Sequence, residues 1–410
     1  MAEQHGKALV PQIRFAGFTD PWEQRKLGEV ARRVTRKNEN RDSDLPLTIS
    51  AQYGLVDQRT FFNNQVASKD MSGYFLLRKG EFAYNKSTST DSPWGAIKRL
   101  EKYDMGCVST LYICFELLSG DPDFLVTYYE TDRWYKAVQL IAAEGARNHG
   151  LLNIAPDDFF ETQICIPKRI DEQRQIGAFF DRLDSLITLH QRKYDKLCVL
   201  KKSMLDKMFP KGGSLYPEIR FAGFTDPWEQ RKLGDVAAVY DGVHQTPDYQ
   251  DEGVMFLSVE NIATLTSQKF ISREAFAKNY PVYPKHGDVL MTRIGDIGTS
   301  NVVETDDKLA FYVSLALLKP FDVDSYYLDK SLQSPSAKEE LYRRTLHIAF
   351  PKKINKNQIA EVMLPIPRSR QEQEQIGALF RDLDSLITLH QRKLELLRNI
   401  KKSMLDKMFV

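Results

Sequence analysis

The chain contains the same long segment twice, and this duplication constrains its architecture more than any other feature. Residues 172–209 read EQRQIGAFFDRLDSLITLHQRKYDKLCVLKKSMLDKMF, residues 372–409 read EQEQIGALFRDLDSLITLHQRKLELLRNIKKSMLDKMF, and ten of these thirty-eight positions differ. A second stretch, IRFAGFTDPWEQRKLG, is identical at residues 13–28 and 219–234. Because internal repeats define the structural unit, we predict a duplicated unit whose dissimilar middles lie at about residues 31–150 and 237–350.

Both copies of the long segment have apolar residues at alternating spacings of four and three, which is typical of a coiled-coil seam. Neither copy contains proline, and Pro167 and Pro367 stand just before them, so each is predicted to be one long helix. His190 and His390 are interpreted as a polar pair that sets the register, with metal ligation as the alternative. The predicted seam is Ile176, Phe180, Leu183, Ile187, His190, Leu197 and Met204, with Ile376, Phe380, Leu383, Ile387, His390, Leu397 and Met404.

The connection between the two halves predicts how the helices run. Only PKGGSLYPE separates the first helix from the second copy of the shorter repeat, and Gly212 and Gly213 make it a short flexible linker. Parallel helices would require the chain to travel back a full helix length, whereas antiparallel helices require no return. We therefore expect an antiparallel pair with a globular domain at each end and a pseudo-twofold internal repeat.

The two middles are predicted to be mixed α/β. Strand-like runs occur at residues 110–118, 160–167, 254–259, 287–294 and 311–320, and residues 336–346 have a helical pattern. The expected fold class is α+β, with two mixed α/β target recognition domains separated by two long helices that form an antiparallel coiled coil. The expected segments are a first domain (1–168), the central helix (169–210), a linker (211–218), a second domain (219–368) and the C-terminal helix (369–410).

The shorter repeat allows two local interpretations. Asp20, followed by a proline, could be the N-cap of a helix; alternatively, WEQRKL could be a short strand that enters a helix at residue 27. In both interpretations the repeat has a structural role and docks each domain onto the helices.

Composition restricts the function classes. The net charge is only +2, so any nucleic-acid binding has to use local basic patches. The four cysteines all lie in the first half and form no CxxC pair, which favours a reducing cytosol over a zinc or disulfide framework. No apolar run is long enough to span a membrane and the first residues lack a signal-peptide core, so a cytoplasmic location is expected.

The sequence lacks the motifs of several common classes of enzyme. TDPW resembles the Asp-Pro-Pro-aromatic loop of amino-methyltransferases, but it has one proline and follows no glycine-rich cofactor loop, so catalysis by Asp20 or Asp226 is not expected. Walker, HExxH and GxSxG motifs are absent from the sequence. No catalytic residue and no metal ligand is predicted.

Polar and basic loops in the two middles are instead candidates for DNA contacts. Arginine, lysine and asparagine can read base edges, while lysine, serine and threonine hold phosphates. The candidates in the first half are Tyr84, Asn85, Lys86, Lys98, Arg99, Arg147, Asn148 and His149; those in the second are Thr292, Arg293, Thr299, Ser300, Asn301, Arg343, Arg344, His347, Lys352 and Lys353.

Two variable domains, each opened by FAGFTDPWEQRKLG and closed by EQxQIGxxFxxLDSLITLHQRK and KKSMLDKMF, resemble the specificity subunit of a type I restriction–modification system. The resemblance covers essentially the whole chain. It implies that each variable domain is a target recognition domain for one half of an asymmetric, bipartite site in double-stranded DNA. It also implies that the helices act as a spacer and dock two modification subunits, which methylate adenine, and that restriction subunits join the assembly.

The resemblance further implies that this subunit is not an enzyme and binds no cofactor, because S-adenosylmethionine, ATP and Mg belong to its partner subunits. Two alternatives remain. One is a specificity subunit of a complex that only methylates; the other is a coiled-coil adaptor whose domains bind proteins. The sequence does not reveal the target bases or the spacer length.

Overall fold

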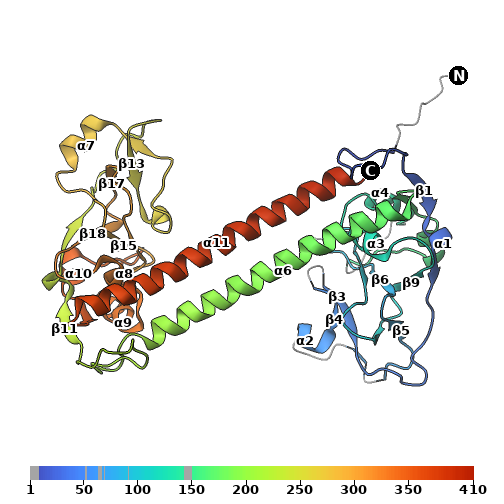
Figure 1. The fold of residues 1–410 in the computed structure, drawn as a ribbon, viewed down its shortest axis with the longest axis horizontal. Coiled ribbons are helices and arrows are strands. Elements are labelled where there is room, and N and C mark those ends of the chain that lie inside the picture. The colour runs from blue at the N-terminus through green and yellow to red at the C-terminus, as the bar shows by residue number, and fades with distance from the viewer. Residues whose placement is uncertain (1–8, 51–52, 63–66, 69, 91, 143–149) are drawn as a thin grey trace. The chain divides into compact units, whose positions relative to one another are not determined.

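A computed structural model describes residues 9–50, 53–62, 67–68, 70–90, 92–142 and 150–410 and divides the chain into two compact units (Figure 1). Unit 1 comprises residues 1–190 and 393–410, and unit 2 comprises residues 191–392. The long helices α6 (Ile170–Lys207) and α11 (Arg370–Met408) each contribute to both units. The segment boundaries expected from the sequence remain a prediction.

The two helices run antiparallel in unit 1. The ring of Phe180 on α6 lies 6.0 Å from that of Phe409, just after α11, and Lys401 Nζ lies 2.6 Å from Asp184 Oδ1. Advancing along α6 from residue 180 to 184 therefore moves back along the partner from residue 409 to 401. Since Ile176, Phe180 and Leu183 are buried in the core of this unit, the predicted seam is the packed face of the helix.

Unit 2 repeats this pairing with the helices exchanged. Phe209, just after α6, lies 6.1 Å from Phe380 of α11 between ring centres, and Lys201 Nζ lies 2.5 Å from Asp384 Oδ1. The helices again run in opposite directions, so the prediction of an antiparallel helix pair is confirmed. The buried seam residues of α11 are Ile376, Phe380 and Leu383, at positions equivalent to those of α6.

Unit 1 has a four-stranded antiparallel sheet in the order β2-β9-β6-β7 and three two-stranded sheets, β1-β10, β3-β4 and β5-β8. Its strands are β1 (Glu23–Lys26), β2 (Ala31–Arg33), β3 (Leu47–Ser50), β4 (Gly54–Asp57), β5 (Phe75–Arg78), β6 (Phe82–Asn85), β7 (Ala96–Arg99), β8 (Met105–Val108), β9 (Ile113–Leu117) and β10 (Gln163–Ile166). Its shorter helices are α1 (Leu27–Val30), α2 (Gln58–Phe62), α3 (Pro122–Tyr128), α4 (Tyr135–Ile141) and α5 (Pro156–Phe160).

Unit 2 has a four-stranded sheet in the order β12-β18-β15-β16, a three-stranded sheet β14-β13-β17 and the pair β11-β19. Its strands are β11 (Glu229–Lys232), β12 (Ala237–Asp241), β13 (Val254–Leu257), β14 (Phe270–Ile271), β15 (Val289–Thr292), β16 (Ser300–Val302), β17 (Leu309–Phe311), β18 (Leu315–Pro320) and β19 (Met363–Ile366). Its other elements are η1 (Leu233–Asp235), η2 (Val259–Asn261), α7 (Arg273–Asn279), α8 (Ser325–Gln333), α9 (Pro335–Arg344) and α10 (Lys356–Ala360). The strand-like runs and the helical run predicted from the sequence all contain elements of these types.

The two dissimilar middles share one framework. In both four-stranded sheets the first strand after the shorter repeat pairs with the strand that leads into α3 or α8. Asp121 and Asp324 then cap these helices by accepting hydrogen bonds from the backbone N–H of Phe124 and Tyr327, both at 2.9 Å. The units differ in what is inserted, because unit 1 adds β3, β4, β5 and β8, whereas unit 2 adds β13, β14, β17 and α7.

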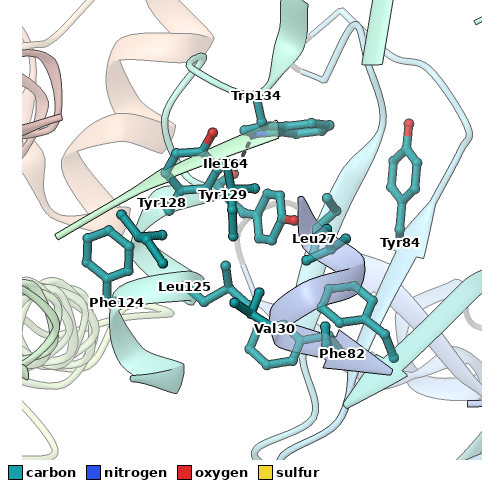
Figure 2. Packing of buried hydrophobic residues seen from close by; sticks show 14 of the residues in the cluster. Leu27, Val30, Phe82, Tyr84, Phe124, Leu125, Tyr128, Tyr129, Trp134 and Ile164 are labelled. Carbon is teal, nitrogen blue, oxygen red and sulfur yellow. Dashed lines mark hydrogen bonds between the residues drawn. The ribbon is translucent and has the colours of Figure 1, made fainter. Parts of the chain in front are cut away.

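Aromatic side chains fill the core of unit 1. Figure 2 shows Phe124, Tyr128 and Tyr129 of the α3 region and Trp134 facing residues of α1 and β6. Trp134 Nε1 donates to the carbonyl oxygen of Tyr129 at 3.2 Å, so its polar atom is satisfied inside the core. The sequence of this middle therefore specifies a packed domain rather than an extended loop.

The shorter repeat forms a strand that docks each domain. Glu23–Lys26 pairs with Gln163–Ile166, and Glu229–Lys232 pairs with Met363–Ile366, so each domain is closed immediately before its long helix begins. The strand interpretation is therefore correct. The N-cap interpretation of Asp20 is wrong, because the following residues pair with β10 and α1 begins only at Leu27.

Buried polar contacts of the long helices explain why the repeats share their sequence. The carboxylate of Glu372 accepts two hydrogen bonds from Arg220, at 2.7 and 2.8 Å, and one from Trp228 Nε1 at 3.2 Å. Gln373 accepts from the backbone N–H of Asp324 at 2.9 Å and donates to the carbonyl of Pro367 at 2.9 Å. These contacts hold the domain against the start of α11.

Unit 1 makes the same contacts with its own copies. Glu172 accepts from Arg14 at 2.6 and 2.7 Å and from Trp22 Nε1 at 3.2 Å. Gln173 accepts from the backbone N–H of Asp121 at 2.8 Å. The duplicated residues are thus the structural joint between domain and helix, as predicted.

A glycine at the joint gives a prediction about stability. A Cβ atom on Gly377 would lie 2.8 Å from Asp324 Oδ1, 2.9 Å from Tyr326 Cβ and 3.0 Å from Tyr327 N. Intrinsic helix propensity alone predicts that Gly377→Ala stabilises the helix by about 1 kcal/mol. We expect the opposite, a loss of about 1–3 kcal/mol in the free energy of unfolding, because the close contact forces α8 away.

Urea denaturation tests this prediction. The control is Ser385→Ala, at an exposed position of the same helix, which should be neutral or slightly stabilising. A stabilising Gly377→Ala substitution would contradict the close approach of α8 to α11.

Candidate DNA interface

Two candidate loops of unit 2, far apart in the sequence, lie together. The loop between β15 and β16 and the loop between α9 and α10 are joined by an antiparallel bridge from Ile294 to Lys353. The backbone N–H of Gly295 donates to the carbonyl of Lys352 at 2.9 Å, and that of Ile354 donates to the carbonyl of Arg293 at 3.0 Å. The two loops therefore form one surface.

Unit 1 brings together the equivalent loops. Residue Ser87, just after β6, bridges to Leu151, ahead of α5. The backbone N–H of Thr88 donates to the carbonyl of Gly150 at 2.6 Å, and that of Leu152 donates to the carbonyl of Lys86 at 3.0 Å. The framework thus builds a paired-loop surface at the same place in both units.

These surfaces lie at the end of each sheet away from the anchored helix. In unit 2, Thr292 pairs with Leu315 at the start of β18, so the paired loops extend from that end of the sheet. The other end of β18 leads to Asp324, which Gln373 of α11 holds. The same order in unit 1 leads from β9 to Asp121 and Gln173. Each unit therefore has an anchored end and an end where loops with different residues gather.

Arg293 is a structural residue, not the exposed DNA contact that the sequence predicted. Its side chain is 6% exposed, forms an ion pair with Asp241, and donates from Nε to the carbonyl of Ile354 at 3.1 Å. Lys86 has the equivalent place in unit 1, donates to the carbonyl of Ile154 at 3.2 Å, and has its pKa lowered by burial. Both cations fasten the second loop to the sheet.

This assignment predicts coupled effects on stability. Arg293→Ala and Asp241→Ala should each lower the free energy of unfolding by about 2–3 kcal/mol, less than the roughly 3–5 kcal/mol of a fully buried pair, because the Asp241 side chain is 28% exposed. The double variant should cost clearly less than the sum of the two single variants, because both single variants remove the same ion pair. Thermal or urea unfolding gives the three values, and fully additive losses would contradict the pairing.

Three further candidates are corrected because their side chains are inside the domains. Tyr84 is fully buried and its hydroxyl donates to the carbonyl of Trp94 at 2.8 Å (Figure 2). The Thr292 hydroxyl, 3.2 Å from the carbonyl of Thr299, and Ser300, whose hydroxyl donates to Asp329 Oδ1 at 2.7 Å, are also buried. Polar residue types suggested exposure, but each of these groups has an internal partner that the sequence does not reveal.

Other candidates are held in intramolecular pairs. Arg99 contacts Glu101 at 2.7 Å and Asp123 at 2.6 Å, and Lys98 contacts Glu130 at 3.4 Å. The remaining candidates of this kind are Arg343 and Arg344, which pair with Glu339 and Glu340, Asn301, which donates to the carbonyls of Ile262 and Ala263, and Asn85, which accepts from the backbone N–H of Ser87. A DNA contact from any of these would compete with an existing partner.

The remaining candidates are at the loop surface. Lys352 and Lys353 are exposed, and within the described part of the chain neither forms an ion pair. Exposed His347 donates a hydrogen bond from Nε2 to the carbonyl of Tyr342 at 2.8 Å, and the half-buried Thr299 donates to Asp296 at 2.7 Å. The candidates Arg147, Asn148 and His149 lie outside the described residues.

Sequence reasoning missed two apolar residues in the same surface. Ile348 is 100% exposed and Phe350 is 103% exposed, between His347 and Lys352. Polar and basic side chains are the residue types that indicate DNA contacts in a sequence, and an apolar pair does not fit that pattern. The sequence feature that could have indicated this pair is HIAFPKK, in which large apolar residues are flanked by basic ones in a predicted loop.

Comparisons with known proteins agree with this geometry. The family model described as "Type I restriction modification DNA specificity domain" matches residues 225–399, which take in the domain of unit 2 and most of α11. Residues 225–399 are therefore a type I restriction–modification DNA specificity domain. Residues 13–28 and 172–209 repeat segments at the two ends of this region, and unit 1 repeats its sheet order, so the first half of the chain resembles it.

Two relatives illustrate the breadth of this family. The type I restriction enzyme MjaVIII specificity subunit of Methanocaldococcus jannaschii is 21% identical over 316 residues, 73% of each chain. The crystal structure of a type I restriction–modification system S subunit from M. genitalium is 15% identical, with a TM-score of 0.58 and coverage of 98% of this chain and 99% of that one. Specificity subunits are the non-catalytic DNA-recognition components of type I systems, which agrees with the prediction that this chain is not an enzyme.

Two further observations concern membrane spans and metal sites. Across the described residues, none of the helices is both long and apolar enough to cross a membrane. In the same part of the chain, histidine, cysteine and carboxylate side chains do not gather in groups of three that could hold a metal ion.

Proposed function

We propose that this specificity subunit reads an asymmetric, bipartite site in double-stranded DNA, one half with each paired-loop surface. The observation that carries the proposal is the duplicated framework, which presents loops of different sequence at equivalent places. Two identical surfaces would favour two identical half-sites. The surfaces here differ, because Lys352 and Lys353 of unit 2 lie where unit 1 has Gly150 and Leu151. Different side chains at equivalent places favour different half-sites.

The shared parts of the framework are proposed to dock the partner subunits. We expect two modification subunits that methylate adenine, because the joint between domain and helix occurs twice with the same residues. Restriction subunits are expected to join the same complex. S-adenosylmethionine, ATP and Mg would be bound by these partners. Reading and chemistry would thus belong to different chains.

The test is selection of DNA from a random duplex library by the chain together with its modification subunits. The expected result is two conserved half-motifs of different sequence, separated by unspecified base pairs. Binding should weaken steeply with salt, because neutralised phosphates release counterions. One continuous motif, or two identical half-motifs, would contradict the proposal.

A further inference from the structure

The tip of the α9–α10 loop exposes apolar surface that does not stabilise the fold. Ile348 and Phe350 are as exposed as in an extended peptide. Burying large apolar side chains stabilises a fold, so leaving two of them in water forgoes that stabilisation. Large exposed apolar groups at one place mark a contact with another molecule.

The tip is held in a fixed place. Leu346 and Lys353 form a bridge in which the backbone N–H of Leu346 donates to the carbonyl of Lys353 at 2.8 Å. Arg293 secures the following residue by donating to the carbonyl of Ile354 at 3.1 Å. The apolar side chains are therefore presented on a loop that is closed at its base, which limits the entropy lost on binding.

The charge around the tip identifies a polyanion as the partner. Residues 345–360 contain Lys352, Lys353 and Lys356 and no aspartate or glutamate. The nearby Asp296 of the adjoining loop accepts a hydrogen bond from Thr299. An apolar tip with cations on its flank matches duplex DNA, in which phosphates border a stack of apolar bases.

We propose that Phe350, with Ile348 beside it, inserts into the base stack of the half-site read by unit 2, while Lys352 and Lys353 hold the adjoining phosphates. Side chains of these types act as wedges that partly unstack a base step and bend the duplex. The inference rests on the proposed function and adds a mode of recognition to it. The segment of unit 1 that precedes Gly150 reads AEGARNH and contains no phenylalanine, tyrosine or tryptophan, so the inference concerns the half-site read by unit 2.

The test uses the complex of the chain with its modification subunits and duplexes that carry 2-aminopurine at successive positions of the target, other than the methylated adenine. With the wild type, binding should raise the fluorescence at one step of the half-site read by unit 2. Phe350→Ala should abolish that rise and weaken binding about 10- to 100-fold, as expected for loss of one stacked aromatic side chain. Phe350→Trp should keep both properties.

The matched control is Phe321→Ala. Phe321 is also an exposed aromatic residue of unit 2, at 65%, but it follows the end of β18 that leads to α8. This variant should bind and fluoresce as the wild type does. Thermal unfolding of both variants should be unchanged, because neither side chain is buried.

Three outcomes would overturn the inference while leaving the proposed function intact. In the first, Phe350→Ala binds DNA and gives the same fluorescence rise as the wild type. In the second, only Lys352→Ala and Lys353→Ala weaken binding, which would make the loop a phosphate contact alone. In the third, Phe350→Ala impairs assembly with the modification subunits and does not act on DNA. If the wild-type complex shows no sequence-specific binding, it is the proposed function that fails.

Discussion

Phe409→Ala should destabilise unit 1, at the opposite end of the sequence, by about 3–5 kcal/mol, the usual cost of truncating a buried phenylalanine. Phe409 is 3% exposed, and its ring lies 5.6 Å from that of Phe124 and 5.9 Å from that of Trp22. The cavity left by the substitution would open between α3, the shorter repeat and the start of α6. The N-terminal domain is thus completed by the last residues of the second helix.

Hydrogen exchange measured by mass spectrometry locates the effect. Phe409→Ala should reduce protection in peptides of β9 and α3 and leave those of β15 and α8 unchanged. Phe209→Ala is the matched control, because Phe209 packs against Trp228 and Tyr327 in unit 2, and it should give the reverse pattern. Loss of protection in unit 2 from Phe409→Ala would contradict the antiparallel pairing.

Glu372→Ala should lower the free energy of unfolding by a similar amount, because it leaves a buried charge without its partner. The Glu372 carboxylate is 1% exposed and binds Arg220, whose side chain is 14% exposed and whose pKa is raised by this hydrogen bond. Removing the carboxylate leaves the guanidinium charged and largely buried, and Trp228 Nε1 loses its acceptor. Breaking a buried pair in this way costs about 3–5 kcal/mol, although the intact pair adds far less to net stability.

The free energy of unfolding of three variants tests this joint. Glu374→Ala is the control, because Glu374 lies on the same helix and pairs with Arg370 at the surface, where such a pair contributes roughly 0–1 kcal/mol. Glu372→Gln should fall between the two alanine variants, since it retains a polar side chain but not the charge. Equal stability of Glu372→Ala and Glu374→Ala would contradict the structural role of the pair.

The parts of the fold that could be predicted are those set by local pattern. The alternating spacing in residues 172–209 and 372–409 predicts the long helices, and the short connection at Gly212 predicts their direction. The apolar run at residues 160–167 likewise predicts the strand before the first long helix. Local pattern suffices here because one helix face and one strand face are buried along their whole length.

The shared framework of the two middles could not be predicted. Ala31 pairs with Leu117 and Ala237 pairs with Pro320 at equivalent places, but the segments between these strands have different lengths and residues. Strand order depends on long-range pairing, and apolar residues of different kinds can occupy the same buried position. The common topology therefore leaves little trace in the sequence.

The exposure of the candidate site residues could be predicted only in part, for a related reason. A loop rich in arginine, serine and threonine indicates a polar surface, but whether a given side chain points outward depends on its partner. Arg293 lies in the predicted loop and faces Asp241, whereas Lys352 and Lys353 in the companion loop remain exposed. The sequence indicates which loops are polar, but it does not indicate which of their side chains point outward.

Sequencing of methylated DNA from cells that carry a domain exchange tests the central proposal most directly. Residues 237–354 of unit 2, which include both of its paired loops, would be replaced by the equivalent region of another type I specificity subunit, with the shorter repeat and both long helices kept. Two independent readers on a duplicated framework predict that one half of the methylated motif changes and the other half keeps its sequence. A motif in which both halves change, or neither does, would contradict the account.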